Sequence, residues 1–193
     1  MLSGAIRHDT MRALILASLA VTTASLRPPD AKVAIAGGGL SGLALAVALK
    51  SAGVDVLVLE KAPALRTKSQ GAMRLTTAGL ADLGAIYASL PDTLRLVGAQ
   101  FDQAIFKHAM ANGTVTSRNA SGFGSGVLVA WADVQDALAN AIREVAGDDS
   151  WLRCDAGVKR YKEESDRVAI ELDDGSVVTA SLLIGADGAF SCV

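Results

Sequence analysis

The sequence predicts an α/β fold in which helices flank a parallel sheet, and three features lead to this prediction. Residues 32–60 read as a short apolar strand, a glycine-rich turn, a helix and a second apolar strand. Helical spacing of apolar residues returns at 133–147, and an apolar run at 182–184 belongs to a late strand. Strand–helix–strand order places the two strands parallel, which is typical of a Rossmann-like dinucleotide-binding fold.

The first strand is short and buried, with Val33, Ile35 and Ala36 as its apolar residues. The helix that follows turns a mostly small face toward the sheet, which allows a close approach. Gly53 is placed to end this helix, because glycine readily adopts the left-handed backbone that closes many helices. The second strand is then expected at Val54–Leu59.

The turn between strand and helix carries Gly37, Gly39 and Gly42 in the spacing G-x-G-x-x-G. The first glycine permits a tight turn, the second lets main-chain amides approach a diphosphate, and the third lets the helix pack on its strand. The helix N-terminus, at Leu40 and Ser41, offers free N–H groups and a positive dipole end to phosphate. These five residues are our candidates for a diphosphate site. An ordinary glycine turn in an unrelated α/β protein is the alternative.

An acid follows the second strand. Glu60 lies 18 positions after Gly42, where a carboxylate can accept both ribose hydroxyls of an adenosine. A 2′-phosphate at this place would bring a second negative charge against the carboxylate. The pattern therefore favours NAD or FAD over NADP in this site.

The middle of the chain has weaker signals. A short helix capped by Thr76 or Thr77 and closed by Gly84 is expected after a polar connection. Asn112-Gly113 predicts a two-residue hairpin turn. Residues 117–126 are rich in Gly, Ser and Asn and read as a loop rather than a second phosphate-binding turn, because no helix pattern follows them.

The last third of the chain predicts a helix and a hairpin. Asp133 is placed to cap a helix that Gly147 ends, and a short strand is expected near Val158. The hairpin pairs 168–172 with 177–183. The strand leads into Gly-Ala-Asp-Gly, which places Asp187 at its carboxyl end, the edge where open α/β sheets bind ligands.

Composition narrows the classes of function. The chain has 193 residues, 51% of them hydrophobic, and a net charge of −2 without a basic block, which argues against a nucleic-acid partner. Cys154 and Cys192 form no metal-ligand spacing and are expected to be free thiols. His8 and His108 lie far apart along the chain. No metal site is expected.

Residues 1–27 resemble a targeting segment. An apolar run from 13 to 21 follows Met11-Arg12, and the small residues at 22–24 resemble a signal-peptidase site. The apolar stretch is too short to span a bilayer, so no stable membrane span is expected. We expect entry into the secretory pathway or a plastid-type organelle if this segment is a signal, and a cytoplasmic chain otherwise. A surface helix is the structural alternative.

The glycine motif with Glu60, followed by the late sequence LIGADGAFS at 183–191, resembles the FAD-dependent aromatic-hydroxylase group of flavoprotein monooxygenases. The late motif G-A-D-G-x-x-S is the more specific of the two. The resemblance implies an FAD-binding fold over 28–193, with NAD(P)H as co-substrate. It assigns the adenosine ribose to Glu60, and the ribose or ribitol region and the diphosphate to Asp187, beside Gly188.

One departure from this family pattern concerns the helix start near Asp133. The family usually has Arg-x-Asp-Leu there, with the arginine touching the cofactor, whereas this chain has Trp-Ala-Asp-Val. Trp131 replaces the arginine, so a cation near the phosphates is lost. We expect the Trp131 indole to pack in the core.

Members of this family continue for a comparable length beyond the position that corresponds to Val193. An incomplete FAD-binding domain is therefore expected. Three functions remain open: the FAD-binding part of a monooxygenase that hydroxylates a small organic substrate, a catalytically inactive dinucleotide-binding module, and a small NAD-dependent dehydrogenase. The late Gly-Ala-Asp-Gly argues against the third. The sequence names no catalytic residue, substrate or oligomeric state; we expect Asp92, Asp102 and His108 to lie exposed.

Overall fold

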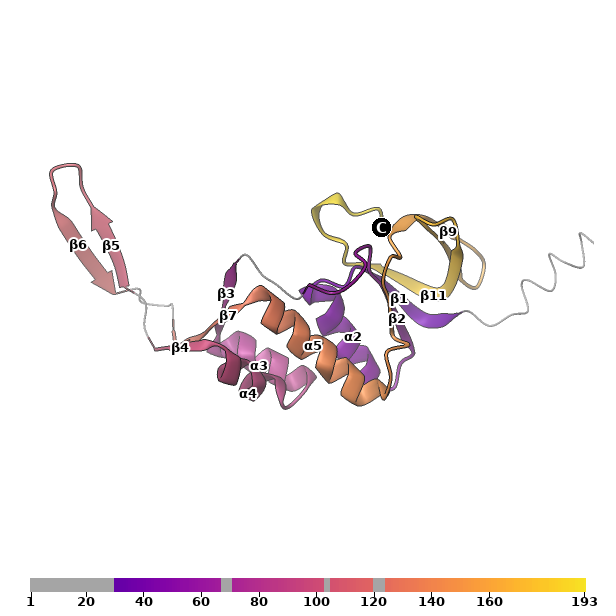
Figure 1. Cartoon of the computed structure of the whole chain (residues 1–193), viewed down its shortest axis with the longest axis horizontal. Coiled ribbons are helices and arrows are strands. Elements are labelled where there is room, and N and C mark those ends of the chain that lie inside the picture. The colour runs from indigo at the N-terminus through magenta and orange to yellow at the C-terminus, as the bar shows by residue number, and fades with distance from the viewer. Residues whose placement is uncertain (1–29, 67–70, 103–104, 120–123) are drawn as a thin grey trace, which may run out of the picture. The chain divides into compact units, whose positions relative to one another are not determined.

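The computed structural model describes residues 30–66, 71–102, 105–119 and 124–193 (Figure 1). Its main sheet has the described strands in the order β8-β2-β1-β11-β10-β9. Strand β1 is parallel to β2 and β11, and β2 is parallel to β8, whereas β9 and β10 pair antiparallel. The predicted parallel sheet with a hairpin is confirmed. The strand bounds are Ala31–Ala36 (β1), Val56–Leu59 (β2), Leu152–Arg153 (β8), Val158–Glu163 (β9), Val168–Leu172 (β10) and Val177–Gly185 (β11).

The first strand–helix–strand unit forms as predicted, with helix α2 (Leu40–Ser51) between β1 and β2. Gly53 ends this helix at a φ of +76°. Strand β2 begins two residues later than predicted, at Val56. The reason is that the Val54 N–H donates to the carbonyl of Leu49 at 2.9 Å, so Val54 still belongs to the helix end.

Strand β1 is buried on both of its faces, as expected for a central parallel strand. Val33 and Ile35 point into the larger core, which they share with α2 and with helix α5 (Trp131–Ala146). Ala34 points into a second core beneath the hairpin of β10 and β11. Burial on both faces fixes the position of the glycine turn that follows β1. If the strand shifted along its neighbours, its side chains would lose their packing in both cores.

Helix α5 packs against α2, and the two run side by side in Figure 1. Its predicted cap at Asp133 is wrong: the N-cap is Ala130, without a side-chain cap. Strand β7 (Gly126–Ala130) runs directly into the helix, so the helix starts before Asp133 can cap it. Gly147 ends the helix as predicted, with a φ of +81° and an N–H bond to the carbonyl of Arg143 at 2.8 Å.

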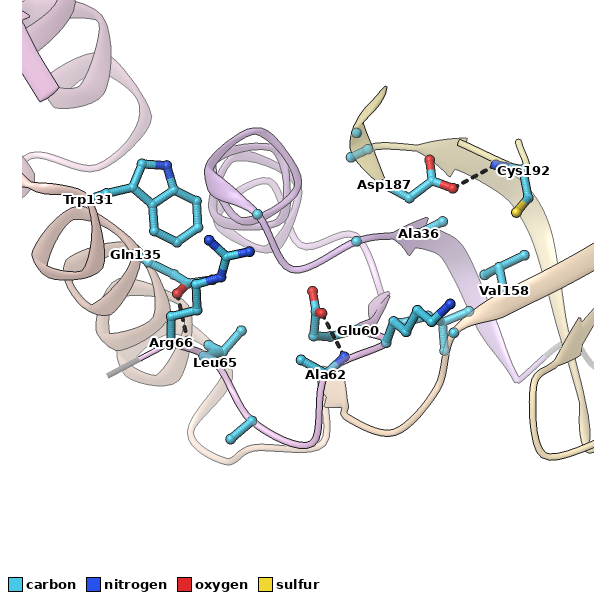
Figure 2. Close-up of a pocket in the computed structure, with 18 residues that line it drawn as sticks. Ala36, Glu60, Ala62, Leu65, Arg66, Trp131, Gln135, Val158, Asp187 and Cys192 are labelled. Atoms are coloured by element: carbon cyan, nitrogen blue, oxygen red, sulfur yellow. Dashed lines mark hydrogen bonds between the residues drawn. The ribbon is translucent and has the colours of Figure 1, made fainter. Parts of the chain in front are cut away.

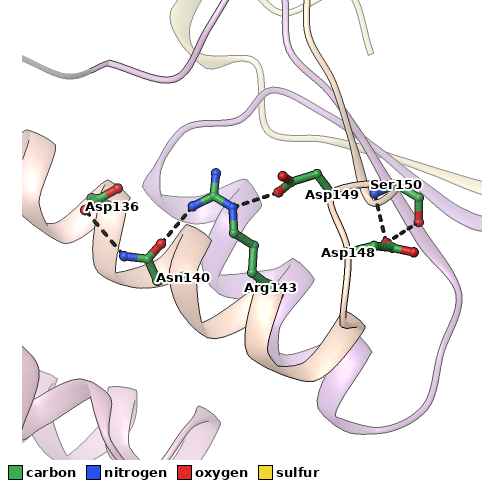
Figure 3. Close-up of polar contacts among 6 residues, drawn as sticks. All are labelled: Asp136, Asn140, Arg143, Asp148, Asp149 and Ser150. Carbon is green, nitrogen blue, oxygen red and sulfur yellow. Dashed lines mark hydrogen bonds and ion pairs between the residues drawn. The ribbon is translucent and has the colours of Figure 1, made fainter.

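The end of α5 is joined to β8 by a network of polar side chains (Figure 3). Arg143 donates from Nε to Asp149 and from Nη1 to Asn140, both at 2.7 Å. Asp148 accepts from the main-chain N–H and the hydroxyl of Ser150, at 2.9 and 2.6 Å. These contacts hold the turn that brings β8 beside β2 and so shape the edge of the sheet near Glu60.

A second sheet combines strands β3 (Ala72–Thr76), β7 and β4 (Ala99–Phe101), with helices α3 (Thr77–Ile86) and α4 (Leu90–Val97) beside it. The predicted Thr76 cap is confirmed, since its hydroxyl accepts the Gly79 N–H at 3.1 Å. The predicted end of α3 at Gly84 is wrong, because the helix continues to Ile86. Strands β3, β4, β7 and β8 and helix α4 were not predicted.

The hairpin around Asn112-Gly113 is confirmed, with strands β5 (Ile105–Ala109) and β6 (Val115–Asn119). Its turn is not the predicted two-residue type. Residues 110–114 form the loop, and the Asn112 side chain accepts the Thr114 N–H at 3.0 Å, which favours the longer turn. Of the predicted loop at 117–126, residues 117–119 belong to β6 and Gly126 to β7, whereas residues 120–123 lie outside the described part of the chain.

Residues 1–29 lie outside the described part of the chain, so the targeting segment at 1–27 and the boundary at residue 28 stay predictions. The compact unit that contains every described element runs from Ala31 to Val193. Among the described helices, none combines the length and the apolar character that a membrane crossing needs.

Candidate dinucleotide-binding site

The turn after β1 requires glycine at its first position. Gly37 has a φ of +104°, and a Cβ there would lie 2.5 Å from the carbonyl oxygen of Ala186. The Gly37 N–H donates to the Leu59 carbonyl at 2.7 Å. The turn is therefore pressed between the ends of β2 and β11, where no side chain fits.

Gly39 differs from Gly37, because a Cβ added to it would meet nothing within 4 Å. Its φ of −72° and ψ of 179° are ordinary for any residue. Gly39 is the N-cap of α2 and offers no side-chain cap, so the first N–H groups of that helix lack intrahelical partners. The open space in front of Gly39 leaves these amides accessible to an anion.

Gly42 serves the contact between helix and turn. A Cβ on Gly42 would lie 2.0 Å from the Gly37 carbonyl oxygen, so α2 packs directly on the turn. Leu40, Ser41 and Gly42 do not line the cavity described below. Their predicted contribution is therefore limited to main-chain amides and, for Gly42, to packing.

Glu60 stands at the end of β2 and faces the glycine turn. Its Oε2 accepts the Gly38 N–H at 2.6 Å and its Oε1 accepts the Ala62 N–H at 2.8 Å. Both oxygens thus hold main chain while each keeps acceptor capacity for a further donor. The carboxylate is oriented before any ligand arrives, as its predicted ribose contact requires.

Asp187 and Gly188 follow β11, at the carboxyl edge of the sheet, as predicted. Asp187 accepts the Ser191 hydroxyl on one oxygen and the Cys192 N–H at 2.9 Å on the other. Partial burial raises the pKa of Asp187, but these hydrogen bonds outweigh burial, so its pKa lies below the ordinary value of 3.8.

Acid should release the turn at 187–193. Because the pKa of Asp187 is lowered in the folded chain, its contacts are fully formed above the ordinary value of 3.8 and are lost as the pH falls through the lowered pKa. We expect the NMR shift of the Cys192 amide to titrate in that acidic range. Asp187→Asn should remove this titration, and a Cys192 amide that titrates equally in the variant would contradict the assignment.

A cavity of about 460 Å³ gathers these residues (Figure 2). Glu60 lies between two groups in this view, with Asp187 and Cys192 on one side and Arg66, Trp131 and Gln135 on the other. Five of the predicted residues line it, and they are Gly37, Gly39, Glu60, Asp187 and Gly188. The turn, the end of β2 and the end of β11 thus meet at one opening, as the sequence predicted.

The sequence did not predict the side of the cavity that is formed by Arg66, Trp131 and Gln135. Gln135 on α5 is only 3% exposed, and its Nε2 donates to the Gly38 carbonyl at 2.6 Å. Its Oε1 accepts the Arg66 N–H at 2.9 Å. The expectation that Trp131 packs in the core is wrong, because the indole is half-buried and lines the cavity. A polar residue on the apolar face of α5 was the available signal for Gln135.

Comparison with known proteins agrees with this geometry. Residues 35–96 match the model of the NAD(P)-binding Rossmann-like domain family. The 3-amino-4-hydroxybenzoate 2-monooxygenase of Streptomyces cremeus is 30% identical over 85% of this chain and 41% of its own length. The chloroplastic zeaxanthin epoxidase of Nicotiana plumbaginifolia is 28% identical over 92% of this chain and 29% of its own.

Solved structures give the same result. The 2-methyl-3-hydroxypyridine-5-carboxylic acid oxygenase superposes with a TM-score of 0.66 and 28% identity, over 85% of this chain and 41% of the oxygenase. The chain belongs to the FAD-dependent flavoprotein monooxygenase family. It corresponds to the N-terminal part of these proteins and spans less than half the length of the relatives it matches.

FAD is the cofactor of this family, and the described residues fit it. The space in front of Gly39 is open, and the Glu60 carboxylate, which accepts the Gly38 N–H of the same turn, lines the same cavity. Asp92, Asp102 and His108 are exposed, as predicted, and do not line the cavity. Cys154 and Cys192 are free thiols, as predicted. Within the described ranges, no group of His, Cys, Asp and Glu is arranged to hold a metal ion.

Proposed function

We propose that this chain binds FAD and forms the FAD-binding part of a monooxygenase that uses NAD(P)H to hydroxylate a small organic substrate. The observation that carries the proposal is the cavity itself: the open Gly39 amides, the fixed Glu60 carboxylate and the Asp187 turn face one opening. The likeness to monooxygenases over most of the chain supports the same conclusion.

The roles of the residues follow from their chemistry. The N–H groups at the start of α2 bind the diphosphate, because they are unpaired and lie at the positive end of the helix dipole. Glu60 accepts the ribose hydroxyls of the adenosine half. Asp187 fixes the turn at the end of β11, where the rest of the cofactor passes. Bound FAD supplies the redox chemistry, accepting electrons from NAD(P)H and passing them to oxygen.

The proposal predicts which nucleotides the purified 193-residue chain binds. We expect FAD to bind, with ADP competing and NADP⁺ competing poorly, because the 2′-phosphate would meet the Glu60 carboxylate. Quenching of flavin fluorescence measures the binding. We expect little NAD(P)H-dependent oxygen consumption, since the chain spans less than half of the monooxygenases it resembles.

Two other results would favour the other functions. Binding of NAD⁺ with no binding of FAD would favour the dehydrogenase. FAD binding by a longer product of the same gene, without any NAD(P)H-dependent reduction of the flavin, would favour the inactive module.

We further propose that residues 1–27 direct the chain to the secretory pathway or a plastid-type organelle. The sequence of this segment supports the proposal, and several relatives are named as chloroplastic enzymes. If the segment is no signal, the chain stays cytoplasmic.

A further inference from the structure

A cation stands on an aromatic ring in the wall of the cavity. The guanidinium carbon of Arg66 lies 5.1 Å from the ring centroid of Trp131, and both residues line the opening. Figure 2 shows the Arg66 side chain rising toward the indole from the segment that follows Glu60. A stack of this kind restricts a flexible arginine to one region while its N–H groups stay free to bind another partner.

The main chain of Arg66 is fixed as firmly as its side chain. Its N–H donates to Gln135, which in turn donates to the Gly38 carbonyl, so one buried amide ties the Arg66 segment to the glycine turn. Trp131 precedes Gln135 by four residues, about one turn of α5, and therefore lies on the same helix face. The Arg66 guanidinium therefore lies against Trp131, which is about one helical turn from Gln135, the residue that contacts the glycine-rich loop.

The charged residues that line the cavity indicate which cation can bind a diphosphate there. Glu60 and Asp187 are its acidic lining residues, and Lys61 and Arg66 its basic ones. Lys61 extends toward Asp173, at 3.8 Å, with 82% of its side chain exposed. Among the residues that the structure describes, no carboxylate lies within ion-pair distance of Arg66. A dinucleotide adds a negatively charged diphosphate to this site, and Arg66 is the basic residue left to neutralise it.

We propose that Arg66 binds the diphosphate of the dinucleotide and that Trp131 is the positioning residue that holds its guanidinium in place. The inference rests on the proposed function, because it names a residue of the same FAD site. It gives Trp131 a role that an indole fulfils without touching the phosphates. The lost cation at the start of α5 is replaced by one from another segment of the chain.

A second arginine offers a matched control. Arg74 stands over the ring of Phe101 at 5.6 Å, the same kind of contact, but neither residue lines the cavity. If such stacks only stabilise the fold, neither Arg66→Met nor Arg74→Met should change ADP binding by a chain that still folds. If Arg66 binds phosphate, only its variant should change nucleotide binding.

The test compares ADP with adenosine, by calorimetry on the 193-residue chain and its variants. We expect Arg66→Met to weaken ADP and FAD binding about tenfold or more, with adenosine binding unchanged within about twofold, because adenosine lacks the diphosphate. Trp131→Ala should weaken ADP binding about threefold, and Trp131→Phe, which keeps a ring, should restore it. Arg74→Met should bind ADP like the unaltered chain. Thermal unfolding of each variant checks that it folds.

Three results would overturn the inference. ADP binding by Arg66→Met that equals that of the unaltered chain would remove Arg66 from the site and leave the proposed function intact. Equal losses for ADP and adenosine would show that Arg66 shapes the cavity without binding phosphate. If the unaltered chain bound neither FAD nor ADP, the proposed function would fail and this inference with it.

Discussion

Gly39→Val should abolish FAD binding while leaving the fold intact. The φ and ψ of Gly39 suit any residue, and a Cβ there meets nothing within 4 Å, so the folded chain accepts valine without strain. Valine restricts the unfolded chain but is a poorer N-cap than glycine, and because these effects oppose each other we expect the free energy of unfolding to change by no more than about 1 kcal/mol. Its methyl groups fill the space before the α2 amides. Flavin fluorescence should show affinity at least about 100-fold weaker.

Alanine variants provide the control for Gly39. Gly39→Ala and Gly79→Ala each add one methyl group where the nearest neighbour is no closer than ordinary contact. Only the first methyl group faces the cavity, so only Gly39→Ala should weaken FAD binding. Unchanged FAD titration by Gly39→Val would place the diphosphate elsewhere and sink the site assignment.

The first unit of the fold could be predicted because its signals are local. Helical spacing, the glycines and the turn at Gly53 act within residues 32–60, and the structure forms those elements nearly as expected. Strands β3 and β7 escaped prediction because each is short and finds its partner far along the chain, where Ala72 pairs with Ala130. Pairing at that separation leaves no periodic signal in either segment.

The candidate site divides in the same way. Glu60 and Asp187 were found because each follows a strand, and parallel strands end at one edge of the sheet. Arg66 and Gln135 were missed because their hydrogen bond joins residues 69 positions apart. The expected core role of Trp131 was wrong for a related reason. The sequence around a tryptophan does not show whether its ring lies in a cavity wall or in a core.

Gly42→Val should have the opposite effect to Gly39→Val and destabilise the chain whether or not FAD is present. A Cβ on Gly42 would lie 2.0 Å from the Gly37 carbonyl oxygen and 3.4 Å from the Ala186 Cβ, so main chain and not a flexible side chain must move. Overpacking a core costs about 1–3 kcal/mol, and a main-chain clash belongs at the upper end. We expect a loss of about 3 kcal/mol or more in urea unfolding.

The comparison of Gly42 with Gly39 separates two reasons for a glycine within one motif. At Gly42 the missing side chain lets α2 touch the turn, so its replacement costs stability first and binding as a consequence. At Gly39 it keeps the helix amides open, so replacement costs binding alone. Gly42→Val with an unfolding free energy within about 1 kcal/mol of the unaltered chain would show that the helix can shift without loss. The close approach of α2 to the turn would then no longer explain the third glycine.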